Sequence, residues 1–415
     1  MHRSITRTYL KHFATVQDGH DGADELMPLT GAQRRFHHTR SADPHDRVRV
    51  LPVFLEFPPG LLSAPRLERA TRAVLLRHPA LRGAADTVGG VPVLRIQPVP
   101  EGPLVREITG SDDGAVWAAL DDWPDGCGSF RVLLARDDRR DLLALGFDHL
   151  VCDGESTGLV LDELMTQCQN GERVPDSAAA AALRRYREAV EEQLAKEHAA
   201  SGPEALEHWV SRVRDAGPGR WGRDRDAGEP GGQVSAWQRV TLPESATARP
   251  FPVLLAACHT ALAGAPGTAP VAYTWGGQDR AGVVGCFLNT VLANPQGDDV
   301  RESWWEDLEF VDTPFDEVVR AARASHASWT GHLDLVLTLI DRTRRPAPVL
   351  DGVPGRFRYL PGNRIEEPVI VTAVHDQGEL ALRIDHDPTI VPGAAAAGIA
   401  DVLRGSFVDA DRVAG

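Results

Sequence analysis

Cysteines are few in this sequence, and long apolar runs are missing. The five Cys, at positions 127, 152, 168, 258 and 286, show no paired spacing. That scatter argues against a disulfide framework and against a zinc ribbon, so we expect reduced thiols, as in a cytoplasm. The N-terminus lacks the apolar core of a signal peptide, and no run is long enough to span a membrane. We therefore expect a cytoplasmic protein without a membrane partner.

Positive charge is also in short supply. The chain has 44 Lys and Arg against 59 Asp and Glu, for a formal net charge of -15. Nucleic acids and anionic membranes favour basic surfaces, so neither is expected as the main partner. The 415 residues suffice for two or three domain-sized units, and a hydrophobic share of 42% can supply their cores. This composition is typical of a soluble globular enzyme.

One stretch, from His149 to Gly154, concentrates the residues that carry chemistry. The apolar run that precedes it, residues 141–147, is typical of a buried strand. A segment follows with apolar residues at 159, 160, 161, 164 and 165, and spacing of three and four is helical. The pattern predicts that His149 ends a strand, and that Asp153 and Gly154 turn the chain into a helix.

Each residue type in this pattern suits a catalytic turn. A neutral imidazole at His149 can take a proton from a hydroxyl or an amine, an effect typically worth ~100- to 10,000-fold in rate. Asp153 can support the turn by pairing with a cation or with backbone N–H groups, and Gly154 allows a backbone angle that other residues disfavour. Alone the pattern is weak, because a strand-end His beside a helix-capping Asp explains it about as well.

Further segments place the pattern in a family. Asp148–Ser156 resembles the H-H-x-x-x-D-G-x-S signature of condensation domains from nonribosomal peptide synthesis. Other segments are similar to that family's motifs, in the family's order: Pro28–Phe36 to P-L-T-x-A-Q, Arg77–Arg82 to R-H-x-x-L-R, Tyr186–Gln193 and Glu207–Trp209 to the helices that open the second half, Val284–Thr290 to V-G-x-F-x-N-T, and Thr313–Arg320 to the helix after it. Each match is modest, but together they are specific and cover most of residues 27–410.

The resemblance implies an α/β fold of two chloramphenicol-acetyltransferase-like lobes that form a V, with the active site and a substrate tunnel between them. Residues 1–26 are expected as a flexible N-terminal lead-in, residues 27–175 as the N-terminal lobe with the H-x-x-x-D-G motif, and residues 176–415 as the C-terminal lobe. Within the first lobe, residues 130–136 and 141–147 predict a hairpin. Residues 171–182 indicate a linker between the lobes.

The resemblance also implies a reaction. Peptidyl or acyl carrier proteins bring phosphopantetheine thioesters to the histidine, where an amine or hydroxyl acceptor attacks the donor and forms an amide or an ester. The resemblance leaves two roles open for His149, general base or positioning of the nucleophile. Asp153 is implied to be structural, and Gly154 to shape the turn and offer its N–H to the oxyanion. No bound cofactor, metal or nucleotide is implied.

Two of the departures from the family pattern concern the predicted site. Asp148 stands where the first His of the signature is found, and neighbouring side chains on a strand face opposite ways, so Asp148 is expected to point away from His149. The family's Arg near the fifth motif is absent from its usual place in residues 275–280, where Arg280 is the nearest cation. Arg280 is therefore our predicted ion-pair partner for Asp153.

Three functions remain open from the sequence. The first is a free-standing condensation enzyme, because no adenylation or carrier domain fits in 415 residues. The second is an acyltransferase of the same superfamily that uses acyl-coenzyme A, and the third is a non-catalytic recruitment domain. A basic cluster at Arg184, Arg185 and Arg187 is a candidate carrier surface, with a solvated helix face as the alternative. The identities of donor and acceptor, and the choice of amide or ester, stay open.

Overall fold

The computed structural model describes residues 4–20, 22, 24–42, 50–110, 112–122, 129–221, 233–242, 250–263, 267, 269–276, 282–294, 300–362, 365, 367–376 and 378–413. The helices are α1 (Ile5–Asp18), α2 (Gly31–Ala42), α3 (Ala64–Arg77), α4 (Asp113–Asp121), α5 (Gly154–Asn170), α6 (Asp176–Ala199), α7 (Pro203–Val213), α9 (Pro250–Leu262), α10 (Val300–Asp307), α11 (Phe315–Ala324) and α12 (Gly393–Val413), with short 3-10 helices at Pro79–Arg82 and Leu308–Phe310. Within these residues, no helix combines the length and the apolar character needed to cross a membrane.

The first sheet contains the strand that leads to the candidate histidine. It comprises β14 (Arg356–Arg358), β2 (Val50–Phe57), β7 (Asp141–Asp148), β6 (Phe130–Arg136) and β5 (Val105–Thr109), in that order. β7 pairs antiparallel with both β2 and β6, which confirms the predicted hairpin. Beside it lies a three-stranded antiparallel sheet of β1 (Glu25–Met27), β4 (Val91–Ile96) and β3 (Gly83–Val88).

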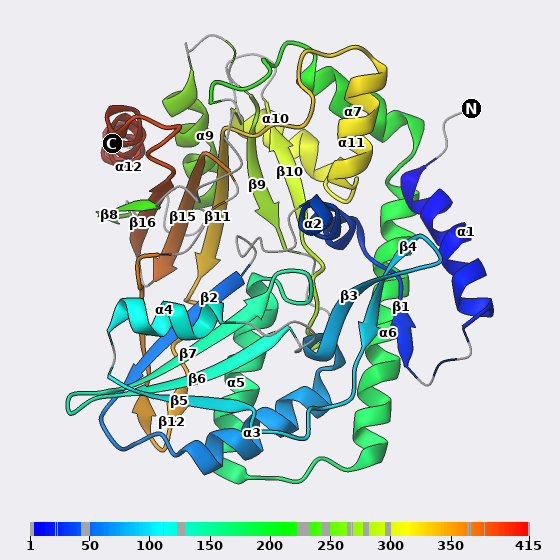
Figure 1. Ribbon diagram of the computed structural model, residues 1–415. Coiled ribbons are helices and arrows are strands. Elements are labelled where there is room, and N and C mark those ends of the chain that lie inside the picture. The colour runs from blue at the N-terminus through cyan, green and yellow to red at the C-terminus, as the bar shows by residue number, and fades with distance from the viewer. Residues whose placement is uncertain are drawn as a thin grey trace.

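Helices cover both faces of the first sheet (Figure 1). Leu143 and Leu145 of β7 belong to a core that includes side chains of α3, α5 and α6. Leu142 and Ala144 point the other way, into a smaller core with α4. All eight residues of β7 are consequently buried, as the continuous apolar run predicts.

The second sheet lies in the other half of the molecule and has its own core (Figure 1). Its strands are, in order, β10 (Asn289–Ala293), β9 (Val271–Trp275), β11 (Leu335–Asp341), β15 (Val369–Asp376), β16 (Glu379–His386) and β8 (Val234–Thr241). The strand β11 is parallel to both of its neighbours, and the other pairs are antiparallel. The core of this half includes side chains of α7, α9, α11 and α12.

The connection between β11 and β15 crosses from the second sheet to the first. It contains the short strands β12 (Val349–Leu350) and β13 (Val353–Pro354), and then β14, which pairs with β2 as an edge strand. Arg66 of α3 binds Asp351 of this segment at 2.7 Å, and Gln169 at the end of α5 donates to the Val349 carbonyl at 3.1 Å. Chain from the C-terminal half thus completes the N-terminal sheet.

The predicted linker at residues 171–182 is shorter than expected. The helix α6 begins at Asp176, so the five consecutive alanines at 178–182 are helical. Alanine has the highest intrinsic helix propensity, which explains the difference. Although the sequence places α6 at the start of the second lobe, its buried stripe of Tyr186, Val190 and Leu194 packs into the core of the first sheet.

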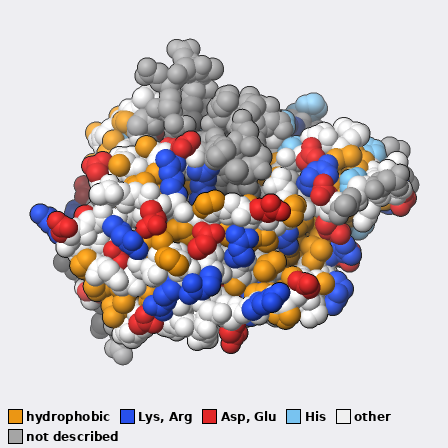
Figure 2. Space-filling model, turned by 60° about the horizontal axis from the view of Figure 1, so that its bottom comes forward, with side chains coloured by type: hydrophobic (Ala, Val, Ile, Leu, Met, Phe, Trp, Pro, Cys, Tyr) orange, Lys and Arg blue, Asp and Glu red, His pale blue; other side chains and the backbone are white. Residues whose placement is uncertain are grey.

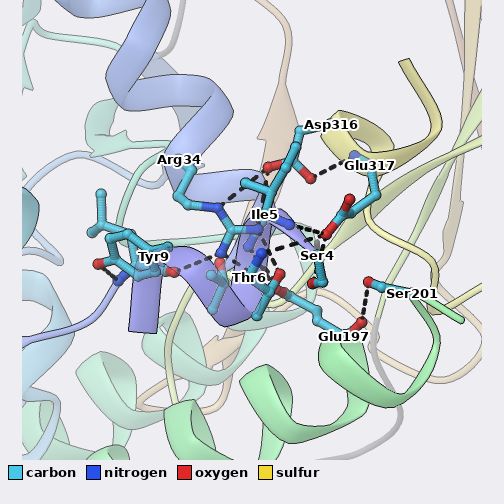
Figure 3. A network of polar contacts seen from close by, with 12 residues as sticks. Ser4, Ile5, Thr6, Tyr9, Arg34, Glu197, Ser201, Asp316 and Glu317 are labelled. Carbon is cyan, nitrogen blue, oxygen red and sulfur yellow. Dashed lines mark hydrogen bonds and ion pairs between the residues drawn. The ribbon is translucent and has the colours of Figure 1, made fainter. Parts of the chain in front are cut away.

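The prediction that residues 1–26 form a flexible lead-in is wrong. Residues 5–18 form α1, and Tyr9 and Phe13, one turn apart, are buried in the first core. The start of α1 is held by α11 of the other half: Glu317 accepts hydrogen bonds from the Ser4 hydroxyl at 2.7 Å and from the Ile5 N–H at 2.5 Å (Figure 3). A fully buried carboxylate satisfies helix N–H groups that would otherwise lack partners, and it also matches the helix dipole.

We expect Glu317→Ala to release α1. The substitution leaves the Ile5 N–H and the Ser4 hydroxyl without their shared acceptor, at a cost of ~1–3 kcal/mol for each buried unsatisfied group. Hydrogen exchange of the α1 amides should accelerate strongly, as measured by mass spectrometry. Ser4→Ala should have a smaller effect, because it removes one donor to Glu317 and the cap of the Arg7 N–H but leaves the Ile5 N–H paired. Equal protection of α1 in Glu317→Ala and wild type would contradict this account of the N-terminus.

Candidate functional site

The turn that carries His149 follows β7 directly, and α5 begins at Gly154, as the sequence predicts. The His149 side chain is half-buried. Its ring lies against the ring of Phe36 from α2, with centroids 4.7 Å apart and planes inclined by 37°. The imidazole therefore has one face against an aromatic ring and is still reachable by a substrate.

Asp148 braces this turn from within. Its carboxylate accepts the Leu150 N–H at 2.9 Å, and its carbonyl accepts the Val151 N–H at 3.0 Å. The side chain is buried at 8% exposure, so both interactions are shielded from water. Asp148, which replaces the first His of the family signature, thus has a structural task in the backbone around His149.

Asp153 connects two distant segments. It caps α5 by accepting the Ser156 N–H at 2.9 Å, and its other carboxylate oxygen accepts the Phe287 N–H at 2.9 Å. Its own N–H donates to the Gly285 carbonyl at 3.1 Å. The sequence left two supports open for Asp153, a cation or backbone N–H groups. In this structure its carboxylate binds backbone N–H groups. The predicted partner Arg280 lies outside the described residues.

The loop at residues 285–287 docks on the first turn of α5 through more than Asp153. The Ser156 hydroxyl donates to the Gly285 carbonyl at 2.8 Å and accepts the Gly285 N–H at 3.0 Å. The Thr30 hydroxyl, just before α2, donates to the Cys286 carbonyl at 3.2 Å. Sequence reasoning did not assign these residues to the site, although the V-G-x-F-x-N-T and P-L-T-x-A-Q resemblances were available as signals.

Gly154 does not serve the purpose that the sequence suggests. It is the first residue of α5, and it is absent from the glycines with positive φ. Helical backbone is open to any residue, so the prediction of a turn angle restricted to glycine is wrong. A Cβ at this position would meet no atom within 4 Å. Gly154 therefore borders open space at the start of α5, and its oxyanion role stays a prediction.

The crossover segment also reaches the start of α5. Arg345 donates to the Glu155 carbonyl at 2.9 Å and pairs with the Glu155 carboxylate at 2.8 Å. The guanidinium lies where a side chain at Gly158 would be, because a Cβ there would come within 2.7 Å of Arg345 Nη1. The glycine makes room for a cation within one turn of Gly154. No sequence pattern pointed to this contact.

The thiols near the site are poor nucleophiles. Burial, together with the neighbouring Asp153 carboxylate, raises the pKa of Cys152 well above its ordinary value, and the same two causes raise the pKa of Cys286. Neutral buried thiols are inert. Cys168 and Cys258 are likewise free and buried. Within the described part of the chain, no three His, Cys, Asp or Glu side chains are grouped to hold a metal ion.

Of the three arginines in the predicted basic cluster on α6, only two are exposed. Arg187 is ion-paired with Glu25 of β1, whereas Arg184 and Arg185 are exposed. On the face at the bottom of Figure 1, which Figure 2 brings forward, Lys and Arg side chains alternate with Asp and Glu. Such a face has no broad field of one sign, so an acidic partner would meet only local pairs of arginines.

Comparison with known proteins finds a family model that matches the N-terminal half of the chain. Residues 23–218 match the family model described as "Condensation domain". The N-terminal half of the chain is therefore similar to condensation domains. The resemblance predicted from the sequence motifs is thereby confirmed.

Curated relatives of this chain are large peptide synthetases. Tyrocidine synthase 2 of Brevibacillus parabrevis is 30% identical over 155 residues, which are 34% of this chain and 4% of that protein. Tyrocidine synthase 3 of the same organism is 27% identical over 158 residues, or 36% of this chain and 2% of that protein. The chain thus spans only a small part of the length of these relatives.

Solved structures show that most of the chain has the fold of condensation domains. The first condensation domain of the calcium-dependent antibiotic synthetase, in complex with a substrate analogue, has a TM-score of 0.70 at 18% identity, over 94% of this chain and 97% of that one. The X-domain from teicoplanin biosynthesis has a TM-score of 0.70 at 16% identity, over 94% and 97%. The predicted mixed α/β fold is confirmed by these matches.

Proposed function

We propose that this protein is a condensation enzyme that forms an amide or ester bond between a carrier-bound acyl or aminoacyl thioester and an amine or hydroxyl acceptor. The observation that carries the proposal is the placement of His149. Its half-buried imidazole directly follows a buried strand, lies against Phe36 and precedes α5, whose first residue, Gly154, borders open space. An imidazole so placed can reach a substrate while its surroundings fix its ring.

In this proposal the acceptor nitrogen or oxygen attacks the thioester carbonyl, and the new C–N or C–O bond replaces the C–S bond. His149 takes the acceptor proton, or orients the acceptor, and the proton leaves with the phosphopantetheine thiol. The start of α5 supplies positive dipole at the developing oxyanion, where the Gly154 N–H is our candidate donor. The thioester arrives activated, so the reaction requires no bound cofactor or metal.

A second function, recruitment of a partner protein without catalysis, is favoured by two observations. Asp148 replaces the first His of the family signature. The X-domain that shares this fold has been solved in complex with OxyB, at a TM-score of 0.68 and 17% identity. A third function is acyl transfer from coenzyme A. One observation favours it: a starter condensation domain of rhizomide synthetase, similar to this chain at a TM-score of 0.71 and 14% identity, was solved in complex with C8-CoA.

We expect carrier-bound donors to react and acyl-coenzyme A to react poorly or not at all. A carrier contributes a docking surface that coenzyme A lacks, and this surface raises the affinity of the delivered thioester. The measurement is mass spectrometry of products from matched acyl groups on a carrier protein, on coenzyme A and on a small pantetheine thioester. Preferential use of coenzyme A would replace the proposal with the acyltransferase. No product from any donor would favour recruitment.

The exposed Arg184 and Arg185 locate the docking face in the same assay. Reversing both charges to Glu should weaken use of the carrier-bound donor at low salt and leave the small thioester unaffected. A charge-matched control reverses Arg239, which is 84% exposed on β8, together with the exposed Arg301 on α10. An identical response of the two double variants would place carrier docking elsewhere.

A further inference from the structure

We propose that Gln33 and Phe36 of α2 are positioning residues for His149: Gln33 fixes the backbone of the turn, and Phe36 fixes the plane of the imidazole. This inference deepens the proposed function and rests on it. It starts from α2 itself, which belongs to neither sheet and lies between them (Figure 1).

The helix α2 is anchored rigidly at its first turn. The Gly31 N–H donates to both carboxylate oxygens of Glu197, on α6, at 2.9 and 3.0 Å. Arg34, with a side chain only 8% exposed, lies 3.6 Å from Glu197 and 3.2 Å from Asp316 of α11 (Figure 3). Burial of a charged network makes its geometry costly to change, because any broken contact strands a charge away from water. The two halves of the molecule thus hold α2 in one place.

Gln33 connects α2 to the turn that carries His149. Its amide nitrogen donates to the carbonyl of Leu150, the residue after His149, at 2.7 Å. Its amide oxygen accepts the Thr30 N–H at 3.0 Å. At 1% exposure, the amide is locked by partners on both of its ends. The carbonyl of Leu150 can therefore move only if α2 moves.

Phe36 stands three residues after Gln33, on the same face of α2. Its buried ring lies 4.7 Å from that of His149, inclined by 37°. Asp148 holds the opposite side of the turn through the Leu150 N–H at 2.9 Å. The peptide groups that flank Leu150 are thus fixed from both directions, and the imidazole before it packs against the tilted ring of Phe36.

Positioning of this kind acts on turnover. A displacement of about 1 Å at a reacting group can cost ~100-fold in rate, even when substrate binding is unchanged. We therefore expect Gln33→Met and Phe36→Leu to lower kcat by ~10-fold or more, with KM nearly unchanged. Gln33→Met keeps the side-chain volume and removes both hydrogen-bonding ends.

Matched controls separate positioning from general damage. Gln169→Met removes a similar bond, from an amide to the Val349 carbonyl at 3.1 Å, at the far end of α5. Phe251→Leu removes a ring that contacts Tyr273 at 5.1 Å in the second core. Both controls should retain wild-type kcat. If Gln33→Met folds poorly, Phe36→Leu still tests the inference, because it leaves the hydrogen bonds of Gln33 in place.

The decisive readout is independent of turnover. NMR spectra of histidine-labelled protein, with His149 assigned by its loss in His149→Ala, report the ring environment and its titration directly. Gln33→Met and Phe36→Leu should shift or broaden the His149 resonances and move its titration midpoint, while the controls leave both unchanged. Unaltered His149 resonances in both α2 variants would overturn the inference. So would altered resonances with wild-type kcat. If wild type forms no product from any donor, the proposed function fails, and the NMR comparison alone decides the positioning.

Discussion

His149→Ala should lower turnover by at least ~100-fold, the lower end of the scale for general-base catalysis by histidine. The structure adds a reason to expect a folded variant. The ring is half-buried and packs against Phe36, while the turn around it is held by backbone contacts that do not involve the imidazole. Product formation by mass spectrometry and the melting temperature, measured on one preparation, test both parts.

The control for His149→Ala is the same substitution at an exposed histidine of α1, His12. It should leave both turnover and melting temperature unchanged. A folded His149→Ala protein with near-wild-type turnover would contradict both roles considered for this residue, base and positioner of the nucleophile. It would also shift support toward recruitment, because that function requires no imidazole.

Asp153→Ala should cost both stability and turnover. It removes the cap of α5 and leaves the buried Phe287 N–H without its acceptor. Loss of a cap typically costs ~0.5–2 kcal/mol, and a buried unsatisfied donor a further ~1–3 kcal/mol. We expect a clearly lowered melting temperature. Turnover should fall because the loop at 285–287 and the first turn of α5 lose their common acceptor.

Two variants separate the contributions of Asp153. Asp112 caps α4 by accepting the Ala115 N–H at 3.0 Å from an exposed position, so Asp112→Ala measures the cost of a lost cap alone. Asp153→Asn retains one acceptor oxygen and should lie between Asp153→Ala and wild type. If Asp153→Ala keeps its melting temperature but loses turnover, Asp153 takes part in the chemistry directly and the structural account is wrong.

The local arrangement at the histidine could be predicted from the sequence. A continuous apolar run, a set of turn residues and a helical repeat placed the end of β7 and the start of α5 correctly around His149. These features depend on residues adjacent in the chain, whose periodicity is directly visible. The family resemblance also came from local motifs, and the match of residues 23–218 confirmed it.

The wrong predictions concerned the backbone conformation of one residue and the order of the N-terminal segment. Gly154 was assigned a special backbone angle, yet it adopts ordinary helical backbone. The segment before residue 27 was predicted to be a flexible lead-in, yet residues 5–18 form α1. The partner that orders α1, Glu317, is separated from Ser4 by 313 positions, and no local pattern links the two residues.

What the sequence alone determined is the order of strands, turns and helices around a histidine of chemical interest. Only the tertiary structure decided how that histidine is held: Gln33 reaches Leu150 from 117 positions away, and Asp153 meets Phe287 across 134 positions. The physical reason is that capping and hydrogen-bonding groups are satisfied by whichever donor the fold brings near. Periodicity reveals which face of an element is buried, but not which distant residue will meet it there.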